Sequence, residues 1–167
     1  QYFRMSLDRS FTLSGTGLVL TGTVGSGEVS VGDQLTLLPH DQEVRVRSIH
    51  AENRESSNAL AGQRCALNIV CDLNVADIER GDTLQDQKLC NSTSRLDVYL
   101  EKSLHLSHKL RHMLPVKFYL GAKKQSAKLA LAPNTKGKRL FEEDKGYVQL
   151  ILDTPISCCY GDRFTTR

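Results

Sequence analysis

The residues able to do chemistry are few, and their spacing argues against a catalytic or metal centre. The five cysteines form no C-x-x-C pair and have no histidine at a ligand-like offset, as a zinc site requires: Cys65, Cys71, Cys90, Cys158 and Cys159. No grouping of His, Cys, Asp or Glu has the spacing of a nucleophile with its base. We therefore expect no catalytic residue and no metal site, and we expect reduced thiols, as in a cytosolic protein.

The glycine-rich segment Phe11–Val24, FTLSGTGLVLTGTV, is the one candidate for a phosphate-binding loop. A Walker loop needs Lys and Ser/Thr after its last glycine, but Gly17 is followed by Leu18 and no lysine precedes Lys88. A dinucleotide-binding loop needs a third glycine where Leu20 stands, and then a helix. We interpret the segment as a hairpin whose glycines allow the chain to reverse before a buried barrel strand.

Charge divides the chain into two parts. Residues 1–90 carry eight Lys/Arg and twelve Asp/Glu, a net charge of −4, whereas residues 91–167 carry fourteen and seven, a net charge of +7. The basic part is a candidate for contact with a nucleic acid backbone, and a solvated lysine-rich surface is the alternative. The candidates for phosphate contacts are Lys117, Lys123, Lys124, Lys128, Lys136, Lys138 and Arg139.

Alternating apolar residues predict strands along nearly the whole chain. Tyr2–Leu7 reads as a half-buried strand that Asp8 and Arg9 end, and Arg64 lies on the strand face opposite the apolar residues that follow it. One helical turn is expected at 74–79, with Asn74 as its cap. Strands at intervals of 8–12 residues with glycine turns between them, including three Gly-Asp turns, indicate closed β-barrels more than a sandwich.

The expected organisation is two domains, at 1–87 and 95–167, joined by a polar linker at 88–94. No run of about twenty apolar residues is present, and the first ten residues lack the apolar core of a signal peptide. We expect a soluble, cytoplasmic protein without a membrane partner. Since the chain begins at Gln1 and not at Met, we also expect it to be a segment of a longer protein.

Several segments resemble one protein family. They are LDRSFTLSGTGLVLTGTV at 7–24, SGEVSVGDQL at 26–35, VRVRSIHAEN at 44–53, AGQRCALNI at 61–69, ERGDTL at 79–84, DTPI at 153–156 and GDRF at 161–164. With these residues the chain resembles domains two and three of the selenocysteine-specific elongation factors, which are translational GTPases. The resemblance covers nearly the whole chain and is more specific in its first half.

The resemblance implies an all-β fold of two consecutive small six-stranded antiparallel β-barrels. It implies that the first barrel holds the aminoacyl end of selenocysteyl-tRNA and that the second contacts the tRNA arms and the GTPase domain. GTP and Mg²⁺ are expected on an N-terminal GTPase domain, and C-terminal domains are expected to bind messenger RNA. The parent protein would then deliver selenocysteyl-tRNA to the ribosome in GTP-dependent UGA decoding, whereas this segment would be no enzyme and would hold no cofactor.

The resemblance also places the aminoacyl pocket at Asp8, Arg9 and Arg64, with His50 as a further candidate. A selenol is more acidic than a hydroxyl, so selenocysteine is an anion at neutral pH and its serine precursor is neutral. Arginine suits this discrimination because it stays charged and offers several donors. The alternative for these arginines is ordinary surface ion pairing, and the alternative for His50 is a surface or packing position.

Two other functional classes stay open at this point. The chain could belong to another translational GTPase, a relative of elongation factor Tu or initiation factor two, which would bind an ordinary aminoacyl end. It could also be a β-barrel scaffold for protein interactions that binds no RNA, which the acidic first half favours.

Overall fold

The computed structural model describes residues 1–167 except 90–91, 104–108, 133–139 and 142–144. The described residues form strands and one 3₁₀ turn, with no α-helix among them, so the predicted all-β fold is confirmed. They divide into two compact units. The first comprises Gln1–Ser92, Leu120–Lys123 and Ile156–Asp162, and the second comprises Thr93–Tyr119, Lys124–Pro155 and Arg163–Arg167.

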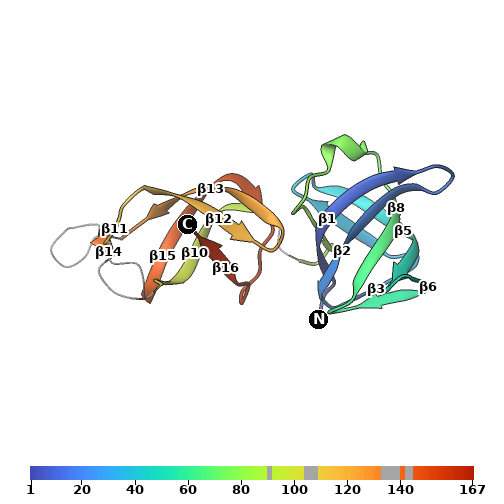
Figure 1. Ribbon diagram of the computed structural model, residues 1–167, viewed down its shortest axis with the longest axis horizontal. Coiled ribbons are helices and arrows are strands. Elements are labelled where there is room, and N and C mark those ends of the chain that lie inside the picture. The colour runs from blue at the N-terminus through green and yellow to red at the C-terminus, as the bar shows by residue number, and fades with distance from the viewer. Residues whose placement is uncertain (90–91, 104–108, 133–139, 142–144) are drawn as a thin grey trace. The chain divides into compact units, whose positions relative to one another are not determined.

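The first unit is a closed barrel. Its strands are β1 (Arg4–Leu13), β2 (Gly17–Ser26), β3 (Glu28–Ser30), β4 (Gln34–Leu38), β5 (Gln42–Ala51), β6 (Arg54–Ser56), β7 (Asn58–Leu60), β8 (Arg64–Val70) and β9 (Thr83–Asp86). Six of them are hydrogen-bonded in the order β4-β9-β1-β2-β8-β5, and β5 pairs again with β4, so the sheet closes on itself (Figure 1). This confirms the predicted six-stranded barrel.

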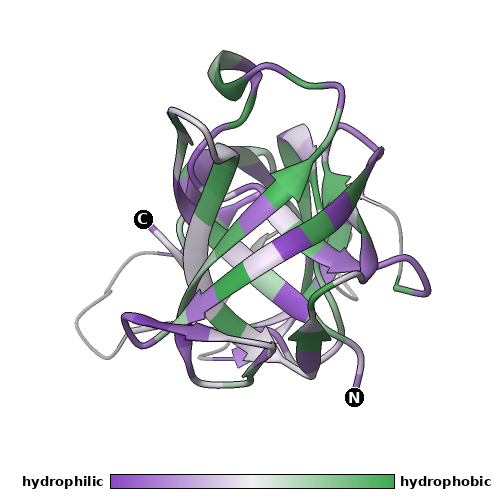
Figure 2. Ribbon diagram, turned by 90° about the vertical axis from the view of Figure 1, so that its right-hand side faces the viewer, coloured by the Kyte–Doolittle hydropathy of each residue, from purple (hydrophilic) through white to green (hydrophobic). Residues whose placement is uncertain are grey.

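Alternation along these strands separates the barrel interior from its outer wall. The interior is filled by fully buried apolar side chains, including Met5, Leu20, Leu37, Ile49 and Leu67. Figure 2 shows the alternation of hydrophobic and hydrophilic residues along the strands of this unit. Because apolar side chains occupy the interior, the polar residues of the same strands lie on the outer wall.

The first strand does not end at Asp8 and Arg9, as the sequence pattern predicted. Strand β1 continues to Leu13, and its Cα partners on β2 change from Leu7–Gly22 to Arg9–Thr21. Asp8 is therefore the extra residue of a β-bulge. A bulge interrupts the apolar alternation in the same way as a strand end does, which explains the wrong prediction.

The three predicted Gly-Asp turns share one geometry. Gly32, Gly81 and Gly161 have φ of 97°, 91° and 91°, which glycine adopts without steric cost at the third position of a type II turn. In each turn the following aspartate accepts a hydrogen bond of 2.8 Å through Oδ2 from the backbone N–H three residues earlier. These bonds run from Ser30 to Asp33, from Glu79 to Asp82 and from Cys159 to Asp162.

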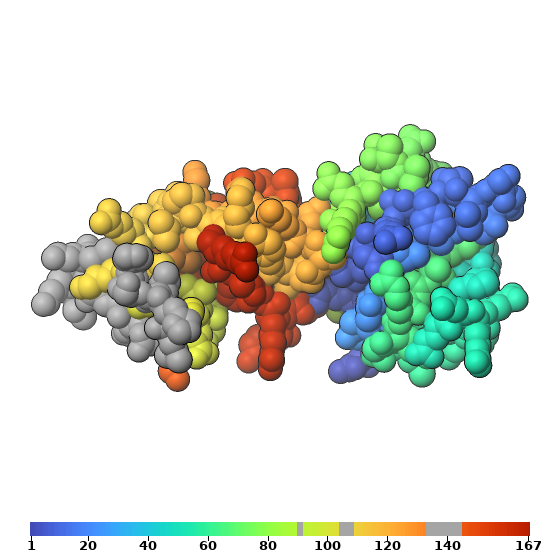
Figure 3. Space-filling view, in the orientation of Figure 1, coloured from blue at the N-terminus to red at the C-terminus, as the bar shows by residue number. Residues whose placement is uncertain are grey.

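The helical turn predicted at 74–79 is a 3₁₀ turn at Val75–Asp77. Asn74 precedes it, but its side chain makes no capping hydrogen bond, so the predicted cap is absent. In the space-filling view this segment and strands β1 and β2 form part of the visible face of the first unit (Figure 3).

The second unit is a curled sheet. Its strands are β10 (Thr93–Glu101), β11 (Leu110–Arg111), β12 (Leu114–Leu120), β13 (Lys123–Ala130), β14 (Leu140–Phe141), β15 (Lys145–Ile156) and β16 (Phe164–Thr166), of which the end residues Leu120, Lys123 and Ile156 belong to the first unit. Five of them follow the order β10-β15-β13-β12-β16, and β11 pairs with β14. Of the predicted linker at 88–94, residues 90–91 lie outside the described residues and Thr93 already belongs to β10.

Candidate functional site

A hollow of about 600 Å³ lies on the outer wall of the first barrel, over strands β1, β2, β8 and β5. Two rows of cross-strand neighbours run across these strands. One row is Phe11, Val19, Asn68 and Ser48, and the next row is Arg9, Thr21, Ala66 and His50. All of these residues except Arg9 line the hollow. Its surface is thus apolar beside Phe11 and Val19 and polar toward the second row.

An ion pair lies at the polar end of this hollow. Arg64 is the first residue of β8, and its Nη1 lies 2.5 Å from Oδ2 of Asp8. The hydroxyl of Thr21, on the strand between them, donates a hydrogen bond to Oδ1 of the same carboxylate. The bulge at Asp8 makes this possible, because it changes the direction of a side chain within a continuous strand.

Asp8 is ionised at neutral pH. Burial alone would raise the pKa of its carboxyl, but the hydrogen bonds from Thr21 and Arg64 and the positive charges of Arg64 and Arg9 outweigh burial and lower it. The carboxylate is therefore an acceptor that holds Arg64. The side chain of Arg64 nevertheless remains 60% exposed, so much of the guanidinium group is available to a ligand.

The structure brings together three of the four predicted pocket residues. Arg64 and His50 line the hollow, and Asp8 reaches it through Arg64. Arg9 does not line the hollow, although it is exposed at the end of the row that contains Thr21 and its charge acts on Asp8. The surface ion pairing considered as an alternative for Arg64 does occur, with Asp8, and it leaves most of the arginine exposed.

Sequence reasoning missed Thr21, which supports this pair, and Asn68, which lines the hollow. Thr21 could have been found, because inward Leu20 and Gly22 place it on the outer face of β2 by simple alternation. Asn68 is buried beneath the hollow, and its Nδ2 donates to the carbonyl oxygens of Thr16 and Leu18 at 2.8 and 3.1 Å. These bonds fix the β1–β2 turn against β8, and no sequence motif marks them.

Cys65 follows Arg64 and points into the barrel, as the alternation predicts. Its side chain is buried, and its sulfur lies 3.4 Å from the sulfur of Met5. Burial raises the pKa of this thiol to about 11, although the charge of Arg64 opposes the shift. Cys65 is therefore a neutral thiol at physiological pH and no nucleophile.

The predicted phosphate-contact residues have different environments. Lys124 and Lys128 are exposed, and exposed Lys117 donates from Nζ to the hydroxyl of Ser126 at 2.7 Å. Lys136, Lys138 and Arg139 lie outside the described residues.

Lys123 differs from the other lysines because its side chain is only 13% exposed. Its Nζ lies 3.2 Å from carboxylate oxygens of both Glu79 and Asp82, all within the first unit. Burial would lower the pKa of Lys123, but these two carboxylates outweigh burial and raise it. The positive charge of Lys123 is thus already balanced by two carboxylates, and we do not retain this lysine as a phosphate contact.

The described residues show neither a metal-ligand cluster nor a membrane-spanning helix. No group of three or more His, Cys, Asp or Glu side chains in this part of the chain is arranged to hold a metal ion. No helix in it has the length and apolar character needed to cross a membrane.

Two family models match the chain, one for each half. The model described as elongation factor Tu domain 2 matches residues 17–85. The model described as selenocysteine-specific elongation factor, beta-barrel domain, matches residues 94–167.

Curated relatives match nearly the whole chain. The selenocysteine-specific elongation factors of Haemophilus influenzae and Escherichia coli are 36% and 35% identical to it over 99% of its length. The chain spans about a quarter of those proteins. By comparison, elongation factor 1-alpha of Pyrobaculum calidifontis is 33% identical over only 48% of the chain.

Solved structures agree with these matches. Translation elongation factor SelB from Methanococcus maripaludis, in its apo form, superposes with a TM-score of 0.83 and 25% identity, over 99% of this chain and 38% of that one. A bacterial selenocysteine-specific elongation factor shares the fold with a TM-score of 0.78. The chain belongs to the selenocysteine-specific elongation factor family, as a segment with an elongation factor Tu-type domain 2 followed by the family's β-barrel domain.

Proposed function

We propose that the hollow on the first barrel binds the aminoacyl end of selenocysteyl-tRNA and that Arg64 recognises the selenolate. The observation that carries this proposal is the position of Arg64, which is fixed by an ionised Asp8 yet remains largely exposed at the edge of the hollow. A guanidinium group held in this way meets an anion without first having to be ordered.

Charge is the basis of selectivity in this proposal. Two unit charges about 4 Å apart interact by up to ~4 kcal/mol at an effective dielectric of ~20. Desolvation and the nearby Asp8 reduce this energy for a selenolate at Arg64, and the neutral hydroxyl of serine has no comparable attraction. Arg9 adds a second positive charge near the same carboxylate, and His50 borders the hollow from β5.

The rest of the proposed function concerns the longer protein. There the segment would present selenocysteyl-tRNA to the ribosome at UGA codons in the cytoplasm, with GTP and Mg²⁺ on a separate GTPase domain and messenger RNA on C-terminal domains. Lys117, Lys124 and Lys128 of the second unit are the proposed contacts to the tRNA backbone, because they are exposed. The family assignment and the basic charge of residues 91–167 support this part.

The test is a comparison of two aminoacylated forms of one tRNA. In a full-length factor that contains this segment, Arg64→Ala is expected to weaken binding of selenocysteyl-tRNA at least about tenfold more than that of seryl-tRNA, which is about 1.4 kcal/mol of selectivity. Arg54→Ala is the matched control, because Arg54 is an exposed arginine of β6 that does not line the hollow. An equal loss for both tRNAs would disprove the assignment of Arg64.

A further inference from the structure

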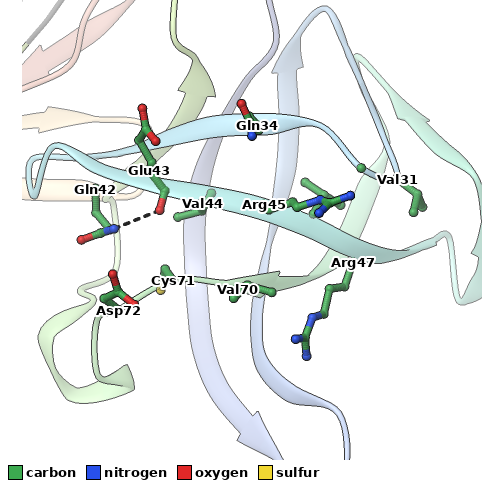
Figure 4. A pocket seen from close by; sticks show the side chains of 12 residues that line it. Val31, Gln34, Gln42, Glu43, Val44, Arg45, Arg47, Val70, Cys71 and Asp72 are labelled. Carbon is green, nitrogen blue, oxygen red and sulfur yellow. Dashed lines mark hydrogen bonds between the residues drawn. The ribbon is translucent and has the colours of Figure 1, made fainter.

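A second hollow, of about 650 Å³, lies on the outer wall of the first barrel over strands β4, β5 and β8. Gln34, Arg45 and Val70 are cross-strand neighbours within it. Arg45 and Arg47 extend from β5 at the end where Val31 lies, and Gln42, Glu43 and Asp72 lie at the other end (Figure 4). The hollow thus has a basic end and an acidic end.

The two arginines at the basic end lack partners. Within the part of the chain that the structure describes, the side chain of neither Arg45 nor Arg47 forms a hydrogen bond or an ion pair, and both residues are exposed. Arg4 and Arg64, in contrast, each pair with an aspartate. A guanidinium group stays charged and presents its donors in a planar fork that fits phosphate or carboxylate. Two such groups without an internal acceptor suit an anionic ligand.

A β-bulge connects this basic end to the first hollow. The Cα partners of β5 on β8 change from Val46–Ile69 to Ser48–Asn68, so Arg47 is the extra residue. Arg47 therefore adjoins Ser48, which lines the first hollow together with His50. Arg47 precedes His50 by three residues, or about 10 Å of strand. This is the length of about three stacked nucleotides at about 3.4 Å each.

We propose that Arg45 and Arg47 bind phosphates of the unpaired nucleotides at the 3′ end of the tRNA whose aminoacyl group occupies the first hollow. The inference rests on the proposed function of that hollow. A tRNA carries its amino acid on the last nucleotide of a single-stranded end, so phosphates must follow within a few nucleotides. Glu43 and Asp72 repel phosphate, and they mark where the contact ends. Because arginine contacts to phosphate read no sequence, this site contributes affinity and position.

A protein segment with acidic residues is the competing occupant, since carboxylates also fit the arginine fork. The RNA is favoured because the arginines continue the wall of the hollow proposed for its aminoacyl end. Among the described residues, no surface beside Arg45 and Arg47 gives a similar reason to expect an acidic peptide.

The test is the salt dependence of RNA binding by a full-length factor that contains this segment. The probes are an RNA stem with a four-nucleotide unpaired 3′ end and the same stem with a blunt end. For the tailed stem, the double variant Arg45→Ala/Arg47→Ala is expected to reduce the slope of log affinity against log salt by about 1.4, or about 0.7 per lost contact with single-stranded RNA. The blunt stem should show no change.

Two control proteins keep the result interpretable. Arg45→Lys/Arg47→Lys retains both charges and should keep most of the slope, which separates loss of charge from misfolding. Arg54→Ala removes an exposed arginine of β6 that lines neither hollow and should leave the slope unchanged.

The outcomes separate this inference from the proposed function. An unchanged slope of the double variant for the tailed stem overturns the inference. If the double variant also loses binding to a glutamate-rich peptide while the RNA slope is unchanged, the occupant is an acidic protein segment and the inference is overturned. Neither result affects the selectivity assigned to Arg64. Conversely, the double variant should weaken selenocysteyl-tRNA and seryl-tRNA equally, since both forms carry the same phosphates; a selective loss would overturn the phosphate assignment.

Discussion

Asp8 on β1 and Arg64 on β8 form an ion pair across the intervening strand β2. Neighbouring strands lie about 4.8 Å apart, so the pair spans about 9.6 Å of sheet, which requires a side chain as long as arginine. Thr21 of the intervening strand binds the same carboxylate and keeps it in place. Three neighbouring strands of the sheet therefore fix the orientation of one exposed guanidinium group.

Replacement of Asp8 by Asn tests the charge of this pair. The pair should contribute at most about 1 kcal/mol to stability, because Arg64 is largely exposed. The pKa of Asp8 is lowered in the folded state. The contribution should therefore be fully present above the ordinary carboxyl pKa of 3.8 and be lost as pH falls through the lower folded pKa.

The measurement for Asp8→Asn is the difference in unfolding free energy between the two proteins in denaturant from pH 2 to pH 8. Because Asn keeps the shape of the side chain, the difference reports the charge. A difference that vanished already near pH 5 would contradict the lowered pKa.

Substitution of Gly22 by Ala tests the close approach of strands β1 and β2 beside the bulge. A Cβ at Gly22 would lie 2.4 Å from the carbonyl oxygen of Ser6 and 2.9 Å from Cγ of Met5. Because backbone cannot yield as a flexible side chain does, Gly22→Ala should destabilise the first unit by about 1–3 kcal/mol or more. The midpoint of thermal or denaturant unfolding measures this loss.

Gly25→Ala in the same strand is the matched control for Gly22→Ala. A Cβ there would be 3.5 Å from the nearest atom, the carbonyl oxygen of Arg4, which is an ordinary contact. Equal destabilisation by both substitutions would show that loss of glycine, and not the close approach, is responsible.

Charge reversal at Lys124 and Lys128 tests the proposed tRNA contacts of the second unit. Each contact should contribute about 0.7–0.9 to the salt slope, so Lys124→Glu/Lys128→Glu should flatten tRNA binding by about 1.4–1.8. The salt slopes of the unaltered protein and the double variant are compared by filter binding of tRNA at roughly 50 to 300 mM salt.

Lys145→Glu, in the exposed start of β15, is the control for Lys124 and Lys128 because it makes the same kind of change at a lysine outside the proposed set. A similar effect from Lys145 would indicate attraction by net charge without a defined contact surface. Lys123→Glu should instead lower stability, since it would place a third carboxylate beside Glu79 and Asp82.

The buried thiol of Cys65 makes stability depend on pH in the alkaline range. Its pKa is raised from 9.0 to about 11 in the folded state, so the folded protein retains this proton more tightly than the unfolded chain. The contribution is fully present below pH 9 and should decline by up to ~3 kcal/mol as pH rises to 11. A Cys65→Ala protein should lose the core packing of the sulfur but not show this component of the decline. Parallel curves for the two proteins between pH 9 and 11 would contradict the raised pKa.

Much of the barrel follows from local patterns in the chain. Apolar alternation with a period of two predicts which residues of β5 and β8 face inward, because a strand places successive side chains on opposite faces. The glycines of the Gly-Asp turns are readable for a similar reason, since a positive φ is costly for other residues. The family resemblance groups Arg64, Asp8 and His50; in the structure Arg64 and His50 line one hollow and Asp8 pairs with Arg64, and their role as an aminoacyl pocket stays a prediction.

The remaining features depend on what lies across the sheet, which no local pattern encodes. Asp8 looks like a strand end, and only its pairing with β2 shows a bulge that turns the carboxylate toward Thr21 and Arg64. Lys123 and Lys124 are adjacent lysines in the chain. Lys123 nevertheless forms ion pairs with two carboxylates, whereas Lys124 is exposed. Such differences arise because register and strand closure bring distant residues within the few ångströms over which ion pairs and hydrogen bonds act.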